Sequence, residues 1–73
     1  MDPKRETPKV TTSGGDWVRF VTHADNPERK WKVRKYFSAY GGRCYSYTDV
    51  ADCESMDAAS VAMEKLYLAA KEA

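Results

Sequence analysis

Residues 30–48, KWKVRKYFSAYGGRCYSYT, decide the fold, because their pattern predicts a β-hairpin around a pair of glycines. Side chains alternate along this stretch: apolar residues such as Trp31 and Val33 share one face, while cations and tyrosines share the other. This two-residue period is typical of a half-buried strand. Gly41 and Gly42 supply the positive φ angles that a tight hairpin turn requires, so the chain is expected to return antiparallel.

Two further segments complete the predicted domain. Residues 16–23, DWVRFVTH, are rich in β-branched and aromatic side chains, which favours a first strand. Ser55 is a good helix N-cap, and the residues after it are strong helix formers whose apolar side chains recur at three- and four-residue spacing. This stripe predicts a C-terminal helix that packs on the sheet and leaves Val61 and Leu68 exposed.

The predicted order of elements is therefore β-β-β-α. The fold class is α+β: a small two-layer domain in which a three-stranded antiparallel sheet packs on one C-terminal helix. Residues 1–15 hold two prolines, two glycines and mixed charges, so they are predicted to form a flexible, disordered N-terminal tail. Residues 16–73 are predicted to form one domain, because a chain of 73 residues has room for only one core.

The composition excludes several classes of protein. No apolar run is long enough to cross a membrane or to form the core of a signal peptide. Two cysteines without a secretion signal are expected to be reduced thiols in an intracellular protein. We expect this protein to be a monomer.

The net charge of +1 conceals an uneven distribution along the chain. Residues 16–43 carry seven Lys or Arg side chains against three Asp or Glu, whereas residues 44–73 carry two against six. We therefore expect a basic sheet and an acidic helical end. Such a dipolar field orients a charged partner more than it attracts any polyanion.

Enzymatic and metal-binding functions have little support. The one histidine, His23, has no obvious catalytic partner, and the carboxylates are spread over predicted loops and the helix exterior. His23, Cys44 and Cys53 are three potential zinc ligands, but their spacing is scattered and lacks a Cys-x-x-Cys pair. We predict a protein that is not an enzyme and binds neither a cofactor nor a metal.

The outward face of the hairpin is the candidate functional surface. Its cations can pair with phosphate or carboxylate groups, and its tyrosines can stack on bases or guanidinium groups. Arg and Tyr are also enriched at hot spots of protein interfaces. A solvated polar face without a partner is the plain alternative. The candidate partner-binding residues are Arg19, Lys30, Lys32, Arg34, Tyr36, Arg43 and Tyr45.

The running sequence, MDPKRETPKV followed by DWVRFVTHADNPERKWKVRKYFSAYGG, resembles small lytic-phage proteins that bind the host bacterial RNA polymerase. Such proteins inhibit transcription initiation and act as antiterminators. The resemblance implies a viral protein in the host cell cytoplasm. It also implies docking near the RNA exit channel, on the N-terminal region of the β′ subunit and the β flap, where nascent RNA is a further potential partner. The resemblance includes no motif from which individual contact residues of this chain could be assigned.

A sheet-based DNA-binding domain is the alternative interpretation. Some three-stranded sheets backed by one helix insert into the major groove of DNA. Against this, autonomous DNA binders of this size are usually strongly basic, and the total charge here is close to neutral.

Overall fold

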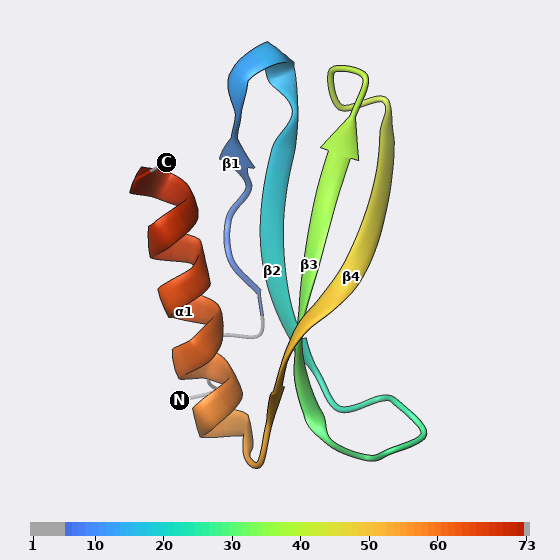
Figure 1. Cartoon of the computed structure of the whole chain (residues 1–73), viewed down its shortest axis with the longest axis vertical. Helices are drawn as coiled ribbons and strands as arrows, with labels where there is room; N and C mark the ends of the chain where they lie inside the picture. The colour runs from blue at the N-terminus through green and yellow to red at the C-terminus, as the bar shows by residue number, and fades with distance from the viewer. Residues whose placement is uncertain (1–5, 73) are drawn as a thin grey trace.

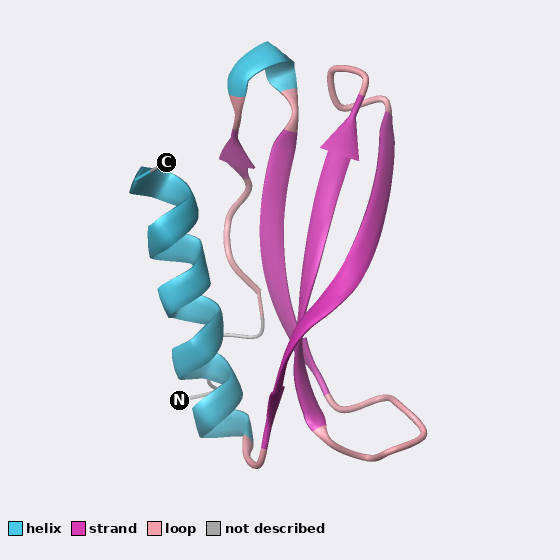
Figure 2. Cartoon of the chain, in the orientation of Figure 1, coloured by secondary structure: helices cyan, strands magenta, loops and turns pink. Residues whose placement is uncertain are grey.

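A four-stranded antiparallel sheet with one helix on one of its faces forms the fold, as the computed structural model of residues 6–72 shows (Figure 1). In the sheet, the strands follow the order of the chain: β1 (Val10–Thr11), β2 (Trp17–His23), β3 (Trp31–Ala39) and β4 (Cys44–Cys53). A short 3-10 helix, η1 (Ser13–Gly15), connects β1 to β2, and α1 (Met56–Glu72) follows β4 (Figure 2). The predicted α+β class with a C-terminal helix is confirmed, but the sheet has four strands rather than three.

The additional strand lies in the segment that was predicted to be a disordered tail. Residues 1–5 of that segment are outside the described residues, but residues 6–11 run beside β2 and the next four residues form the turn into it. Thr7 is buried, its backbone N–H donates to the carbonyl of Phe20 at 2.8 Å, and its Oγ1 accepts from the N–H of Phe20 at 3.0 Å. The prediction missed this strand because a two-residue pairing is too short to show a period in sequence.

The β3–β4 hairpin has a longer second strand and a longer turn than predicted. Ala39 pairs with Cys44, so four residues form the loop, and β4 continues to Cys53, beyond the stretch that was predicted to form the hairpin. Both loop glycines have positive φ, 70° and 90°. Their N–H groups donate to Oδ1 of Asp16 at 3.0 and 3.3 Å, which fastens the loop to the start of β2.

The core lies between α1 and one face of the sheet, which we call the inner face. Its fully packed members are Phe20 and Val33 from the sheet and Ala59 and Met63 from α1. The Ser55 hydroxyl accepts from the N–H of Ala58 at 3.1 Å, as the N-cap prediction required.

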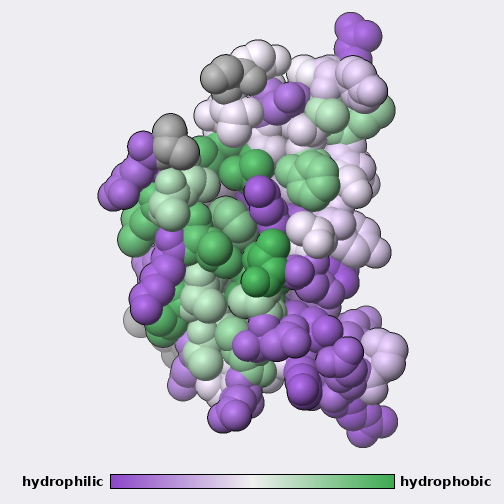
Figure 3. All heavy atoms as spheres, in the orientation of Figure 1, coloured by the Kyte–Doolittle hydropathy of each residue, from purple (hydrophilic) through white to green (hydrophobic). Residues whose placement is uncertain are grey.

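The helix covers only part of the inner face. Trp31 packs against the core as predicted, but Phe37 is 36% exposed and Ala39 is exposed, although the alternation of β3 places both on the same face as Trp31. Val61 and Leu68 are exposed, 55% and 49%, as predicted. Figure 3 shows hydrophobic residues over the helix and the adjoining sheet, and hydrophilic residues at the lower right, where the β2–β3 loop lies.

Candidate functional site

The opposite face of the sheet, which we call the outer face, is not covered by a helix in the described part of the chain. Strand alternation and the observed register place the odd-numbered residues of β2 and the even-numbered residues of β3 there. One half, towards the β3–β4 loop, is aromatic and cationic. The other half, towards the β2–β3 loop, is made of ion pairs.

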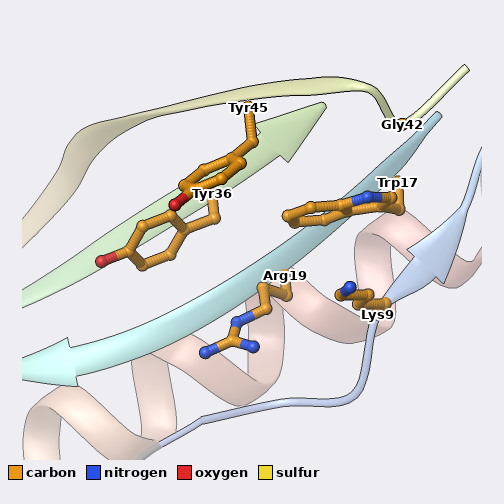
Figure 4. Close-up of a pocket in the computed structure, with 6 residues that line it drawn as sticks. All are labelled: Lys9, Trp17, Arg19, Tyr36, Gly42 and Tyr45. Atoms are coloured by element: carbon orange, nitrogen blue, oxygen red, sulfur yellow. The ribbon is translucent and has the colours of Figure 1, made fainter. Parts of the chain in front are cut away.

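The aromatic half contains an open pocket with a volume of about 440 Å³. Its lining residues come from the segment before β1, from strands β2, β3 and β4, and from the β3–β4 loop (Figure 4). Three of the predicted site residues are brought together in it. The pocket is lined by Lys9, Trp17, Arg19, Tyr36, Gly42 and Tyr45.

Rings and cations alternate around this pocket. The Nζ of Lys9 lies 4.4 Å from the centre of the Trp17 ring, and the guanidinium of Arg19 lies 5.6 Å from the centre of the Tyr36 ring. The Trp17 and Tyr45 ring centres are 6.4 Å apart with 32° between the planes. Tyr45 is 70% exposed, so much of this aromatic surface is available to a partner.

Arg19 is only partly neutralised within the protein. Its Nη2 donates to Oε2 of Glu6 at 2.8 Å, in a salt bridge whose acidic partner is 62% exposed. Its Nε is buried and has no hydrogen-bond partner among residues 6–72. The Glu6 contact is near the surface, where an ion pair contributes about 1 kcal/mol or less. A ligand anion can therefore compete for this guanidinium.

The ion-paired half contains two of the predicted cations. Arg34 Nε donates to Oδ1 of Asp49 at 3.0 Å, and the Lys32 ammonium lies 3.5 Å from Glu28 and 3.7 Å from Asp52. The hydrogen bond to Asp49 raises the pKa of Arg34. Partial burial works to raise the pKa of Asp49, but its hydrogen bonds with Arg34 and His23 outweigh this and lower the pKa.

This pairing corrects the expectation of a purely basic sheet. The register places acidic residues of β4 directly opposite cationic residues of β3, as in the Lys32 and Asp52 pair. The excess positive charge of the first half of the chain and the excess negative charge of the second half therefore meet on one surface. The guanidinium of Arg34 also lies 4.2 Å from the centre of the Tyr47 ring, so it contacts both the Asp49 carboxylate and an aromatic ring.

The histidine has a partner that the sequence did not reveal. The Nε2 of His23 lies 3.1 Å from Oδ1 of Asp49, the atom that also accepts from Arg34. A histidine paired with a carboxylate is a common part of acid–base sites. Here the carboxylate is held by an arginine, which favours a structural charge cluster.

Lys30 and Arg43 stand apart from the rest of the predicted site. Lys30 precedes β3 and borders a second pocket with Trp31 and Asp52, whereas Arg43 lies in the β3–β4 loop, beyond the far end of β3. Both are exposed, and within residues 6–72 neither side chain forms a salt bridge. They are cations that an external partner can reach without breaking an internal contact.

Sequence reasoning missed the other three residues of the pocket, which are Lys9, Trp17 and Gly42. Trp17 has the same strand parity as Arg19, so the alternation of β2 alone was enough to place the two on one face. Lys9 gave no such signal, because its position depends on the pairing of β1 with β2.

Other chemistry has little geometric support in the described part of the chain. Among residues 6–72, no three His, Cys, Asp or Glu side chains gather closely enough to hold a metal ion. Cys44 and Cys53 are free thiols at the two ends of β4. The described helices include none with the length and apolar character needed to cross a membrane.

Comparisons with known proteins found no match: no protein-family model, no curated protein and no solved structure is significantly similar to this chain.

Proposed function

We propose that this protein is a phage-encoded, non-enzymatic regulator that binds host bacterial RNA polymerase in the cytoplasm. It docks near the RNA exit channel, against the β′ N-terminal region and the β flap, where it inhibits initiation and promotes antitermination. The sequence resemblance is the source of this proposal. The observation that carries it is the outer face, a helix-free sheet surface that presents exposed rings beside cations.

The chemistry of the outer face suits a patterned protein partner. Aromatic residues and arginine contribute most of the binding energy at many protein interfaces. The tyrosines at 45 and 47 are 70% and 54% exposed, so covering them removes a large apolar area from water. The ion pairs of the other half present alternating charges, which favour a partner whose own charges alternate.

Duplex DNA is the weaker alternative. Lys32 and Arg34 face carboxylates within the protein, so phosphate contacts must compete with Asp52 and Asp49. The same carboxylates would lie close to the phosphates and repel them. A sheet inserted into the major groove needs free cations along its exposed face.

A retention assay with purified polymerase tests the proposal. Immobilised protein is incubated with host RNA polymerase at about 0.05 and 0.2 M salt, and a gel shift on random duplex DNA is run at the same salt. We expect retention of polymerase without a shift of the duplex. A duplex shift without polymerase retention would instead establish the DNA-binding alternative.

A charge-reversal variant locates the surface within the same assay. Lys30→Glu combined with Arg43→Glu should weaken polymerase retention by about tenfold and reduce its salt dependence, because like charges would face the partner. The fold should be unchanged, since both side chains are exposed. Lys65→Glu on α1 is the matched control and should bind as the parent does. Undiminished binding by the double variant would move the interface to the exposed pair Val61 and Leu68.

Transcription in vitro tests the functional half of the proposal. Added before initiation, the protein should reduce transcript yield from a promoter. Added to halted elongation complexes, it should increase read-through at an intrinsic terminator. Polymerase binding with no effect in either arrangement would contradict the regulatory role.

A further inference from the structure

We infer that the outer-face pocket binds one nucleotide of a single-stranded nucleic acid. The base lies against the rings of Trp17 and Tyr45, and the phosphate lies near Lys9 and Arg19. The proposed function does not by itself provide such a site, because a polymerase-binding protein needs no affinity for nucleic acid. The inference rests on the pocket alone, and only the identification of the strand as emerging RNA depends on the proposed function.

The two rings are held in position by the strand between them. Trp17 and Tyr45 come from β2 and β4, and Ser38 of β3 lies between them, directly paired with Tyr45. Ser38 is small and buried, and its Oγ accepts from the backbone N–H of Trp17 at 2.7 Å. The rings can therefore lean together over it, to a centre-to-centre distance of 6.4 Å. Two rings anchored on a rigid sheet form a stacking platform for a flat base.

The two cations of the pocket, Lys9 and Arg19, lie close to its rings, where they can contact the phosphate of a nucleotide whose base stacks on those rings. Figure 4 shows Lys9 and Arg19 below the Trp17 ring and the two tyrosines to the left of it. The ammonium of Lys9 lies over the Trp17 ring, on a side chain that is exposed and free to turn towards an anion. Within residues 6–72, the Arg19 side chain makes one hydrogen bond, through Nη2 to Glu6. Its Nε is buried, so the donors that remain for a ligand are those on the two terminal nitrogens.

The backbone leaves room for this ligand at Gly42. A Cβ at this position would lie 3.6 Å from Nε1 of Trp17, in contact with the indole edge. Glycine keeps that edge of the pocket open, and the Asp16 contact fixes the loop that carries it. The pocket volume of about 440 Å³ falls within the range of about 300–1,000 Å³ found for small-ligand sites.

Rings and cations together favour a single strand over two other polyanions. A duplex keeps its bases stacked inside, where these rings cannot reach them. An acidic peptide would satisfy the cations but would leave the rings without a flat partner. Base stacking on aromatic side chains tolerates any sequence, so the expected binding is sensitive to salt and nearly indifferent to sequence.

Fluorescence anisotropy with a labelled octauridylate tests the inference on the full-length protein without polymerase. We expect saturable binding that Tyr45→Ala weakens by about tenfold or more and Lys9→Ala by severalfold. Tyr40→Asn is the aromatic control, because Tyr40 is exposed outside the pocket and has a φ of 57°, which asparagine tolerates. Lys65→Ala is the cation control. Both controls should bind within about twofold of the parent.

Competition against the octauridylate and the NMR signal of one tryptophan provide two further tests of the inference. A duplex of equal length, polyphosphate and a glutamate-rich peptide should each compete at least about tenfold less well than the octauridylate. In NMR spectra, the indole N–H signal of Trp17 should shift on binding, while that of Trp31 on the inner face should not. Equal competition by polyphosphate or peptide, an unshifted Trp17 signal, or an unaffected Tyr45→Ala variant would overturn the inference.

The outcome is separable from that of the proposed function. Octauridylate binding without polymerase retention would support the pocket and remove the polymerase proposal. Polymerase retention without octauridylate binding would support the polymerase proposal and remove the inference about the pocket. An octathymidylate arm identifies the strand: weaker binding than the RNA supports a transcript as the occupant, and equal binding supports a site that recognises base and phosphate without the sugar.

Discussion

Arg34 and Asp49 are partners across β3 and β4, and a 3.0 Å hydrogen bond joins Nε of the arginine to Oδ1 of the aspartate. His23 of β2 reaches the same oxygen at 3.1 Å, so a single carboxylate links three strands. The arrangement shows how the outer face neutralises part of its own charge.

This link predicts a specific pH dependence of stability. The pKa of Asp49 is lower in the folded protein than its ordinary value, so the unfolded chain takes up this proton first as the pH falls. The stabilisation is complete above the ordinary pKa of about 4 and is lost as the pH falls through the lower folded pKa. Asp49→Asn should therefore reduce stability at pH 7 by about 1 kcal/mol or less and flatten the dependence below about pH 4.

Urea unfolding at a series of pH values measures this effect. Asp25→Asn, in the β2–β3 loop, is the control and should follow the parent curve. Identical slopes for Asp49→Asn and the parent in acid would show that Asp49 is not held by its neighbours.

Two positions on α1 test the assignment of its faces. Met63 is 2% exposed in the core, so Met63→Ala should lower the free energy of unfolding by about 2–5 kcal/mol. Leu68 is 49% exposed on the same helix, and Leu68→Ala should cost about 0.5 kcal/mol or less. Chemical denaturation of both variants gives the comparison. Equal losses would mean that the helix packs with a different face.

The edge position of the N-terminal segment depends on the Thr7 hydroxyl. Thr7→Val keeps the shape of the side chain but leaves the buried N–H of Phe20 without its acceptor, which should cost about 1–3 kcal/mol. Hydrogen exchange at the Phe20 amide should become faster. Thr11→Val is the control, because Thr11 is exposed in β1. Unchanged exchange and stability in Thr7→Val would favour the mobile tail that the sequence predicted.

The β3–β4 loop should depend on Asp16. Asp16→Ala removes the acceptor for the N–H groups of Gly41 and Gly42 and should cost about 1–2 kcal/mol. Asp16→Asn retains a carbonyl oxygen at the same position and should cost less. Amide chemical shifts of the two glycines, measured beside the melting curve, report the loop directly. A loop whose signals do not move in Asp16→Ala would be held by other contacts.

The sequence predicted those features that follow from the regular spacing of apolar and polar residues along a strand or a helix. The alternation of β3 placed Trp31 and Val33 on the inner face and Lys32, Arg34 and Tyr36 on the outer face, as the register shows. The helix stripe and its Ser55 cap followed from spacing and hydroxyl chemistry in the same way. These features depend on residues close together in the chain, so one sequence is enough to predict them.

The site depended on contacts between distant residues. The predicted site residues separated into three groups: Arg19, Tyr36 and Tyr45 in the pocket, Lys32 and Arg34 in ion pairs, and Lys30 and Arg43 unpaired at the ends.

That separation follows from the β3–β4 register, which includes a bulge between Val33 and Arg34. A shift of one residue in this register would take Asp49 away from Arg34 and turn Tyr45 to the inner face. The chain alone therefore determined which residues lie on each face of its longest strands and of its helix. Only the tertiary structure decided which cations are neutralised and which rings meet, because strand pairing and the position of residues 6–12 are set by packing across the whole sheet.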